Sequence, residues 1–115
     1  MKKLVFIAIV YMVSSCASDS EEDILQMAES CGTSVSFQSE VQDILTNNCA
    51  ISGCHNGDNG SSRNYLIFDN VQNNSQAIRS RTSARTMPPS SSGITLTSGQ
   101  IQTISCWVEQ GSQNN

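Results

Sequence analysis

The sequence predicts a small helical domain whose core needs a crosslink, a metal or a cofactor to complete it. Two segments, residues 36–48 and 97–111, carry apolar side chains at helical spacing and start with helix-capping residues. Between residues 31 and 115, Leu, Ile, Val and Phe number only sixteen in 85 residues, about 19%. A domain of this size with so few core side chains usually depends on a covalent staple or a bound group.

The first fifteen residues are typical of a bacterial lipoprotein signal peptide. Lys2 and Lys3 precede an apolar run, Leu4–Val13, which is too short to cross a bilayer as a stable helix. The run ends in Val-Ser-Ser-Cys, which resembles a lipobox, so Cys16 is predicted to be lipidated. The alternative is ordinary secretory cleavage near Ser15. We expect an exported protein anchored to the periplasmic or outer face of a bacterial membrane, with the outer membrane favoured.

The chain that remains after this cleavage is acidic. Loss of residues 1–15 leaves four arginines against ten carboxylates, a formal charge of −6. This charge argues against nucleic acid or anionic lipid as an electrostatic partner. Residues 16–30 are polar and acidic, which predicts a flexible tether, and residues 31–115 are predicted to form one domain.

Residues 36–48 are predicted to form the first helix. Its apolar side chains recur at i, i+4, i+7 and i+8 and form one stripe: Phe37, Val41, Ile44 and Leu45. Ser36 or Ser39 can cap the start, and Ser39 with Gln42 fits a capping box. Asn47 and Asn48 are expected to end the helix.

The middle of the domain is less regular. Residues 56–63 are rich in Asn, Gly and Ser and predict a loop. Residues 65–68 fit either a short strand or the approach to a helix that starts near Asp69. Val71 and Ile78, seven apart, support that helix. Residues 85–93 contain the pair Pro88-Pro89 and predict a surface loop.

The last helix has the clearest boundaries. Thr97 with Gln100 fits a capping box, and Gly111 stands where a helix commonly stops. The apolar stripe consists of Ile101, Ile104 and Val108, with Trp107 beside it.

The stretch that carries chemistry is Cys49-Ala-Ile-Ser-Gly-Cys54-His55. Two cysteines with a histidine directly after the second form the attachment signature of c-type haem, although the usual spacer has two residues rather than four. At about 100° per residue, cysteines five apart lie about 140° from each other on a continuous helix. The spacer must therefore bulge, and Ser52-Gly53 supplies flexible backbone for this.

Three other interpretations of these residues remain open. A zinc site would use Cys49, Cys54 and His55, but the chain has no second histidine, and adjacent ligands fit one tetrahedral metal poorly. A Cys49–Cys54 disulfide would suit an oxidising compartment and leave His55 without a role. A nucleophilic Cys-His pair would need a third, orienting group that the sequence does not indicate.

Met87 is the candidate for a sixth iron ligand. It lies about thirty residues after His55, next to two prolines that fix the backbone, so the loop can hold a thioether at small entropic cost. The alternative is a methionine without a ligand role. Met1 and Met12 fall in the signal segment and Met27 in the tether, so they are poorer candidates.

Three stretches of the sequence resemble small cytochrome c domains of bacterial lipoproteins and exported enzymes. They are VSFQSEVQDILTNNCAISGCHNG, NYLIFDNVQNNSQAIRSRTSARTMPP and LTSGQIQTISCWVEQGSQNN, which cover about residues 35–115. The resemblance implies the all-α class I cytochrome c fold, with the terminal helices packed around one covalent haem c. It implies His55 as the proximal ligand, Met87 as the distal ligand, thioethers at Cys49 and Cys54, and Trp107 near the haem. The four-residue spacer departs from the usual pattern of the family.

The same resemblance implies a disulfide. With Cys16 assigned to lipid and Cys49 and Cys54 to haem, Cys31 and Cys106 remain, and the terminal helices of small c-type cytochromes pack against each other. A Cys31–Cys106 bridge would staple that contact and is worth ~4 kcal/mol in the chain-entropy model. The alternative is two free thiols.

The expected function is single-electron transfer between redox protein partners by a monomeric monohaem cytochrome that transforms no substrate. One alternative keeps the haem but leaves the sixth site open, which would suit a sensor or a small peroxidase. Another is a cofactor-free, disulfide-stapled surface lipoprotein. Two roles are open for Arg79, Arg81 and Arg85: one or more of them pairs with a haem propionate, or they are solvated surface side chains.

Overall fold

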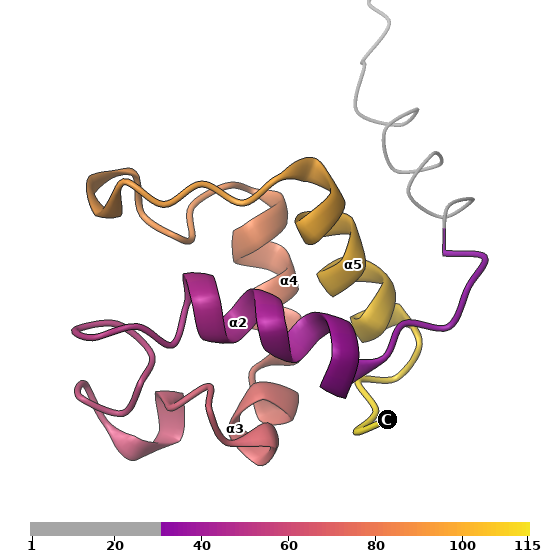
Figure 1. The fold of residues 1–115 in the computed structure, drawn as a ribbon, viewed down its shortest axis with the longest axis horizontal. Coiled ribbons are helices and arrows are strands. Elements are labelled where there is room, and N and C mark those ends of the chain that lie inside the picture. Colours follow the sequence, from indigo (N-terminus) through magenta and orange to yellow (C-terminus); the bar gives the residue numbers. More distant parts are fainter. Residues whose placement is uncertain (1–30) are drawn as a thin grey trace, which may run out of the picture.

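Four α-helices and three short helical turns make up residues 31–115, the part of the chain described by this computed structural model (Figure 1). The predicted signal peptide, the tether and the lipidation site Cys16 lie outside the described residues. The elements are η1 (Phe37–Val41), α2 (Gln42–Asn48), η2 (Ser61–Arg63), α3 (Phe68–Asn73), α4 (Ser75–Ser83), η3 (Ser90–Ser92) and α5 (Ser98–Glu109). Residues 31–115 contain no β-strand, so the expected all-α class is confirmed for this part of the chain.

The first predicted helix is confirmed, as a π-helical turn, η1, that continues into α2. Ser36 is the capping residue. Its side chain accepts a hydrogen bond from the Ser39 N–H (3.2 Å), and the Glu40 carboxylate accepts one from the Ser36 N–H (2.8 Å). The predicted capping box of Ser39 with Gln42 is wrong, because Ser39 already lies inside the first turn. The side chains of Ser36 and Glu40 instead accept hydrogen bonds from the backbone N–H groups of Ser39 and Ser36 at the start of the helix.

The middle segment forms two helices where the sequence predicted one. Asn74 separates α3 from α4, and its side chain donates to the carbonyl of Asn70 (2.8 Å). Asparagine side chains compete with the backbone for such hydrogen bonds, which explains the break. Residues 65–68 form no strand; Tyr65 to Ile67 lead directly into α3.

The last helix, α5, has the predicted ends. The Thr97 hydroxyl accepts from the Gln100 N–H (3.2 Å), and the Gln100 side-chain oxygen accepts from the Thr97 N–H (2.9 Å). The helix ends at Glu109, and Gly111 follows with a φ of 101°, a left-handed conformation that favours glycine. The predicted stripe is buried, together with Trp107 and Cys106.

The first and last helices pack against each other. The Trp107 ring lies 5.4 Å from the Phe37 ring, centroid to centroid, and Phe37 also contacts Phe68 at 4.8 Å. The expected disulfide is present: Cys31 and Cys106 are bonded, with Cα atoms 5.4 Å apart. A covalent bridge therefore joins the segment before η1 to α5.

No helix among residues 31–115 combines the length and the apolar character needed to cross a membrane.

Candidate functional site

One cavity of about 410 Å³ brings together all four residues that the sequence singled out for haem. Cys49, Cys54, His55 and Met87 all line it, although 38 positions separate the first from the last. The lining comes from the end of α2 and the loop after it, from α4, and from the loop after α4. The apolar part of the lining includes Ala77, Ile78, Pro88, Pro89 and Ile94.

The four-residue spacer bulges as predicted. The helix α2 ends at Asn48, and the Cys49 N–H donates to the Leu45 carbonyl (2.9 Å), so Cys49 stays attached to the end of the helix. Beyond it, Gly53 adopts a φ of 77°, and the Cys54 N–H donates to the Ile51 carbonyl (3.0 Å). The His55 N–H then donates back to the Cys49 carbonyl (3.0 Å). This loop is what allows Cys49 and Cys54 to line the same cavity.

His55 is held on two sides. Its ring stacks on Tyr65, with centroids 4.2 Å apart and planes 5° from parallel. Its Nδ1 lies 3.2 Å from the carbonyl oxygen of Arg63. A carbonyl oxygen can only accept a hydrogen bond, so this contact favours the tautomer with the proton on Nδ1. The lone pair on Nε2 is then available to a metal, an arrangement common for metal-binding histidines.

The two cysteines of the cavity are free thiols, whereas Cys31 and Cys106 are bonded to each other. Burial, and secondly the neighbouring Cys54, raise the pKa of Cys49 to about 11. The Cys49 thiol therefore keeps its proton at neutral pH and reacts slowly as a nucleophile.

Alkylation of haem-free protein should reveal this protected thiol. A rise of the pKa from 9.0 to about 11 lowers the thiolate fraction near pH 8 roughly a hundredfold. Iodoacetamide should thus label Cys49 about a hundredfold more slowly in the folded chain than in the same chain in urea, as followed by peptide mass mapping. Equal rates in the two conditions would contradict the burial of this thiol.

Met87 enters the cavity from the loop after α4. It is half-buried, and its N–H donates to the Arg81 carbonyl (3.2 Å), which ties the loop to the end of the helix. Pro88 and Pro89 follow and line the cavity as well.

Only one of the three arginines considered from the sequence lines the cavity. Arg79 forms an ion pair with Glu109, and Arg85 donates to the Leu96 carbonyl (3.3 Å) and the Ser98 hydroxyl (3.2 Å). Arg81 does line the cavity, together with Arg63. Among residues 31–115, no carboxylate lines the cavity, so the charged side chains that these residues bring to it are cationic although the chain as a whole is acidic.

Sequence reasoning missed Arg63 and Tyr65. Both follow His55 within ten residues, but neither belongs to a motif or a periodic pattern. Burial raises the pKa of the Tyr65 hydroxyl, which stays protonated. Trp107, expected near the haem, is not among the residues that line this cavity. It is only 1% exposed and packs on Phe37.

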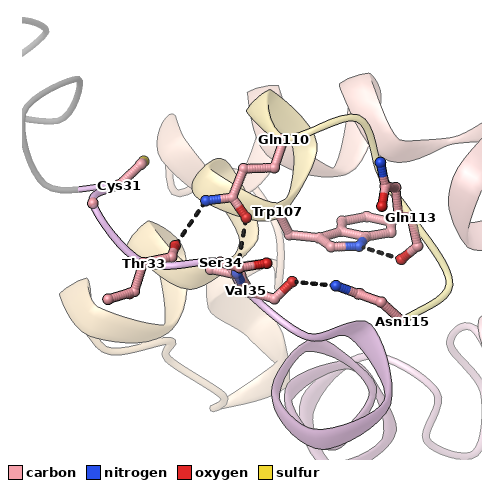
Figure 2. Close-up of a pocket in the computed structure, with 9 residues that line it drawn as sticks. Cys31, Thr33, Ser34, Val35, Trp107, Gln110, Gln113 and Asn115 are labelled. Atoms are coloured by element: carbon pink, nitrogen blue, oxygen red, sulfur yellow. Dashed lines mark hydrogen bonds between the residues drawn. The ribbon is translucent and has the colours of Figure 1, made fainter.

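A second cavity, of about 380 Å³, lies where the segment after Cys31 crosses the end of α5 (Figure 2). Gln110 accepts from the Val35 N–H (2.8 Å) and donates to the Thr33 carbonyl (2.8 Å). The Trp107 indole donates to the Gln113 carbonyl (2.9 Å), as Figure 2 shows. Apart from the bonded Cys31, none of the described residues that line this cavity has an ionisable side chain. Its polar groups serve the contact between the two ends of the domain.

Residues 31–115 contain no group of three His, Cys, Asp or Glu side chains arranged to hold a metal ion. Axial ligation of a haem iron requires only one side chain on each face.

No protein-family model, curated protein or solved structure matches the chain.

Proposed function

We propose that the protein is an exported, lipid-anchored monohaem cytochrome c that carries single electrons between redox proteins. The observation that carries this proposal is the convergence of Cys49, Cys54, His55 and Met87 on one cavity. The proposed fold is that of class I cytochromes c, supported by the packing of Phe37 on Trp107 between the terminal helices. Lipidation at Cys16 and the position at the membrane rest on the sequence alone.

The chemistry of the donor set fits a c-type haem. Two free thiols and an adjacent imidazole are the groups that such a cofactor uses, and the same cavity is lined by apolar side chains and by the thioether-bearing Met87. Arg63 and Arg81 would face the two propionates, because no lining carboxylate competes for these arginines. A bound haem would supply reversible one-electron chemistry at its iron.

The residues of the chain would then fix the iron and control its potential. His55, oriented by the Arg63 carbonyl and by Tyr65, would present Nε2 as the proximal ligand. Met87 would be the distal ligand. Ligation by one histidine and one methionine raises the reduction potential and leaves no open coordination site, which suits electron transfer rather than catalysis on a substrate.

An intact-mass measurement with an absorption spectrum tests the proposal. The full chain should be produced in a bacterial host that has haem-attachment machinery. We expect the mass of one haem on the mature chain, a Soret band, and a haem that stays with the protein after denaturation. A chain that carries no haem under these conditions would instead indicate a cofactor-free, disulfide-stapled lipoprotein.

Replacing Met87 by alanine should open the sixth coordination site. The wild-type reduced protein is expected not to bind carbon monoxide. The reduced Met87→Ala protein should lack the spectrum of a six-coordinate iron before the gas is added, and should then bind carbon monoxide. Met27→Ala, a change in the predicted tether, is the matched control and should behave as wild type. Binding of carbon monoxide by the wild-type protein would favour the sensor or peroxidase alternative, in which Met87 is not a ligand.

A further inference from the structure

The polar loop that follows His55 folds back against the spacer between the two cysteines. The side chains of Asp58 and Asn59 make hydrogen bonds to the spacer backbone, and the Asn56 amide donates to the Asp58 carboxylate. Neither Cys49 nor His55 is a partner in these bonds. The contacts to the spacer backbone concentrate on one residue, Gly53, where the spacer bulges.

Asp58 holds the N–H side of Gly53. Its Oδ2 accepts from the Gly53 N–H at 3.0 Å, from the Asn56 amide at 2.8 Å, and from the Ser52 hydroxyl at a longer 3.5 Å. The Gly53 hydrogen bond, followed by the one from Asn56, lowers the pKa of this carboxyl. The group is therefore ionised at neutral pH, and a charged acceptor makes the stronger hydrogen bond.

Asn59 holds the opposite side of the same residue. Its amide donates to the Gly53 carbonyl at 2.7 Å and more weakly to the Cys54 carbonyl at 3.3 Å. Gly53 is thus restrained at both its N–H and its C=O. The restraint matters because glycine has the widest choice of backbone conformations, and Gly53 is in the left-handed region at φ 77°.

We propose that Asp58 and Asn59 are positioning residues that lock the Gly53 bulge, so that Cys54 and His55 face the same cavity as Cys49. This inference rests on the proposed function. Cys49 is already fixed by its hydrogen bond to α2, whereas Cys54 follows the bulge and depends on its conformation. The spacer has two residues more than usual, which gives its backbone additional conformational freedom. The hydrogen bonds of Asp58 and Asn59 to Gly53 restrict that freedom.

The expected consequence is a difference between the two cysteines in haem attachment. Each thiol adds its S–H across one vinyl group: an S–C bond forms, the hydrogen goes to the other vinyl carbon, and no oxidant or reductant is consumed. Loosening the bulge should leave attachment at Cys49 intact and impair it at Cys54. A general loss of stability would instead affect both sites together.

The test compares Asp58→Ala and Asn59→Ala with Asp43→Ala, all in the full chain with haem-attachment machinery. Asp43 is an exposed carboxylate in the first turn of α2 that is not hydrogen-bonded to the spacer, so its replacement controls for the loss of one negative charge. Peptide mapping measures the fraction of chains in which Cys54 carries no haem. This fraction should be roughly three- to tenfold higher in Asp58→Ala and Asn59→Ala than in wild type, because the loss of one modest hydrogen bond changes an equilibrium by about that factor. Asp43→Ala should match wild type.

Hydrogen exchange of the Gly53 amide provides a readout that needs no haem. Exchange should be roughly three- to tenfold faster in Asp58→Ala than in wild type, because the Gly53 N–H loses its hydrogen bond to the Asp58 carboxylate. If Asp58→Ala fails to accumulate, Asp58→Asn, which keeps the size and one acceptor oxygen, should show a smaller effect in the same direction.

The possible failures are distinguishable. Attachment at both cysteines in every variant, as in wild type, overturns the positioning role and leaves the cytochrome proposal standing, even if Gly53 exchange changes. Equal loss at Cys49 and Cys54 indicates a structural role only and also overturns the inference. A wild-type chain without haem overturns the proposed function, and the positioning role with it.

Discussion

Replacing both Cys49 and Cys54 by serine is expected to abolish covalent retention of haem. Serine keeps the size of each side chain but cannot form the thioether, so any haem that still binds through His55 should be lost on denaturation. Haem staining after denaturing electrophoresis measures this directly. The single variants Cys49→Ser and Cys54→Ser should each retain haem through one bond and show a shifted absorption band, because one vinyl group stays unreacted.

The control for this experiment is the other cysteine pair. Cys31→Ser with Cys106→Ser removes two cysteines that do not line the cavity formed by Cys49, Cys54, His55 and Met87. This variant should keep its covalent haem wherever it folds. Haem retained covalently in the Cys49/Cys54 double variant, or lost only in the Cys31/Cys106 variant, would contradict the assignment of the four cysteines.

Removing the Cys31–Cys106 bridge is expected to cause the largest loss of stability of any change at a single contact. The bond closes a loop with a sequence separation of 75, for which the chain-entropy model gives ~4 kcal/mol. Small domains have a total unfolding free energy of about 5–15 kcal/mol, so this is a large fraction. The free energy of unfolding of the Cys31→Ala, Cys106→Ala protein, from urea titration, should fall by about that amount.

Wild-type protein in a reducing agent provides the matched comparison for that stability measurement. It should unfold at the same urea concentration as the double alanine variant, apart from the small packing change at Cys106, which is 3% exposed. A loss below about 1 kcal/mol would mean that the unfolded chain is already constrained by other contacts, and that the bridge adds little.

The sequence predicted the elements of the fold that depend on interactions between residues close together in the chain. The stripe that begins at Phe37 and the Thr97–Gln100 capping box identified the first and last helices, because both depend on residues within one or two turns. The choice of Ser36 over Ser39 as cap, and the break at Asn74, depend on which of several equivalent polar side chains reaches the backbone. Such choices are settled by tertiary contacts that a single sequence does not reveal.

The residues of the candidate site likewise fall into those that the sequence predicted and those that it did not. Cys49, Cys54 and His55 form a contiguous motif, and Met87 stood out through its two prolines, so sequence reasoning found them. Arg63 and Tyr65 contribute through a carbonyl oxygen and a stacked ring, and neither contribution has a spacing rule. Trp107 was expected near the haem by family resemblance, but packing on Phe37 places it in the core.

The segment that begins at Cys31 joins the domain on one side, at the right of Figure 1, while the loops around residues 50–65 and 86–94 lie on the other. The two cavities formed at these places have no lining residue in common. If residues 16–30 form the flexible tether that the sequence predicts, this tether would meet the domain on the side away from the cavity that is proposed to hold haem. A soluble redox partner could then reach that cavity from the aqueous side without the bilayer blocking its approach.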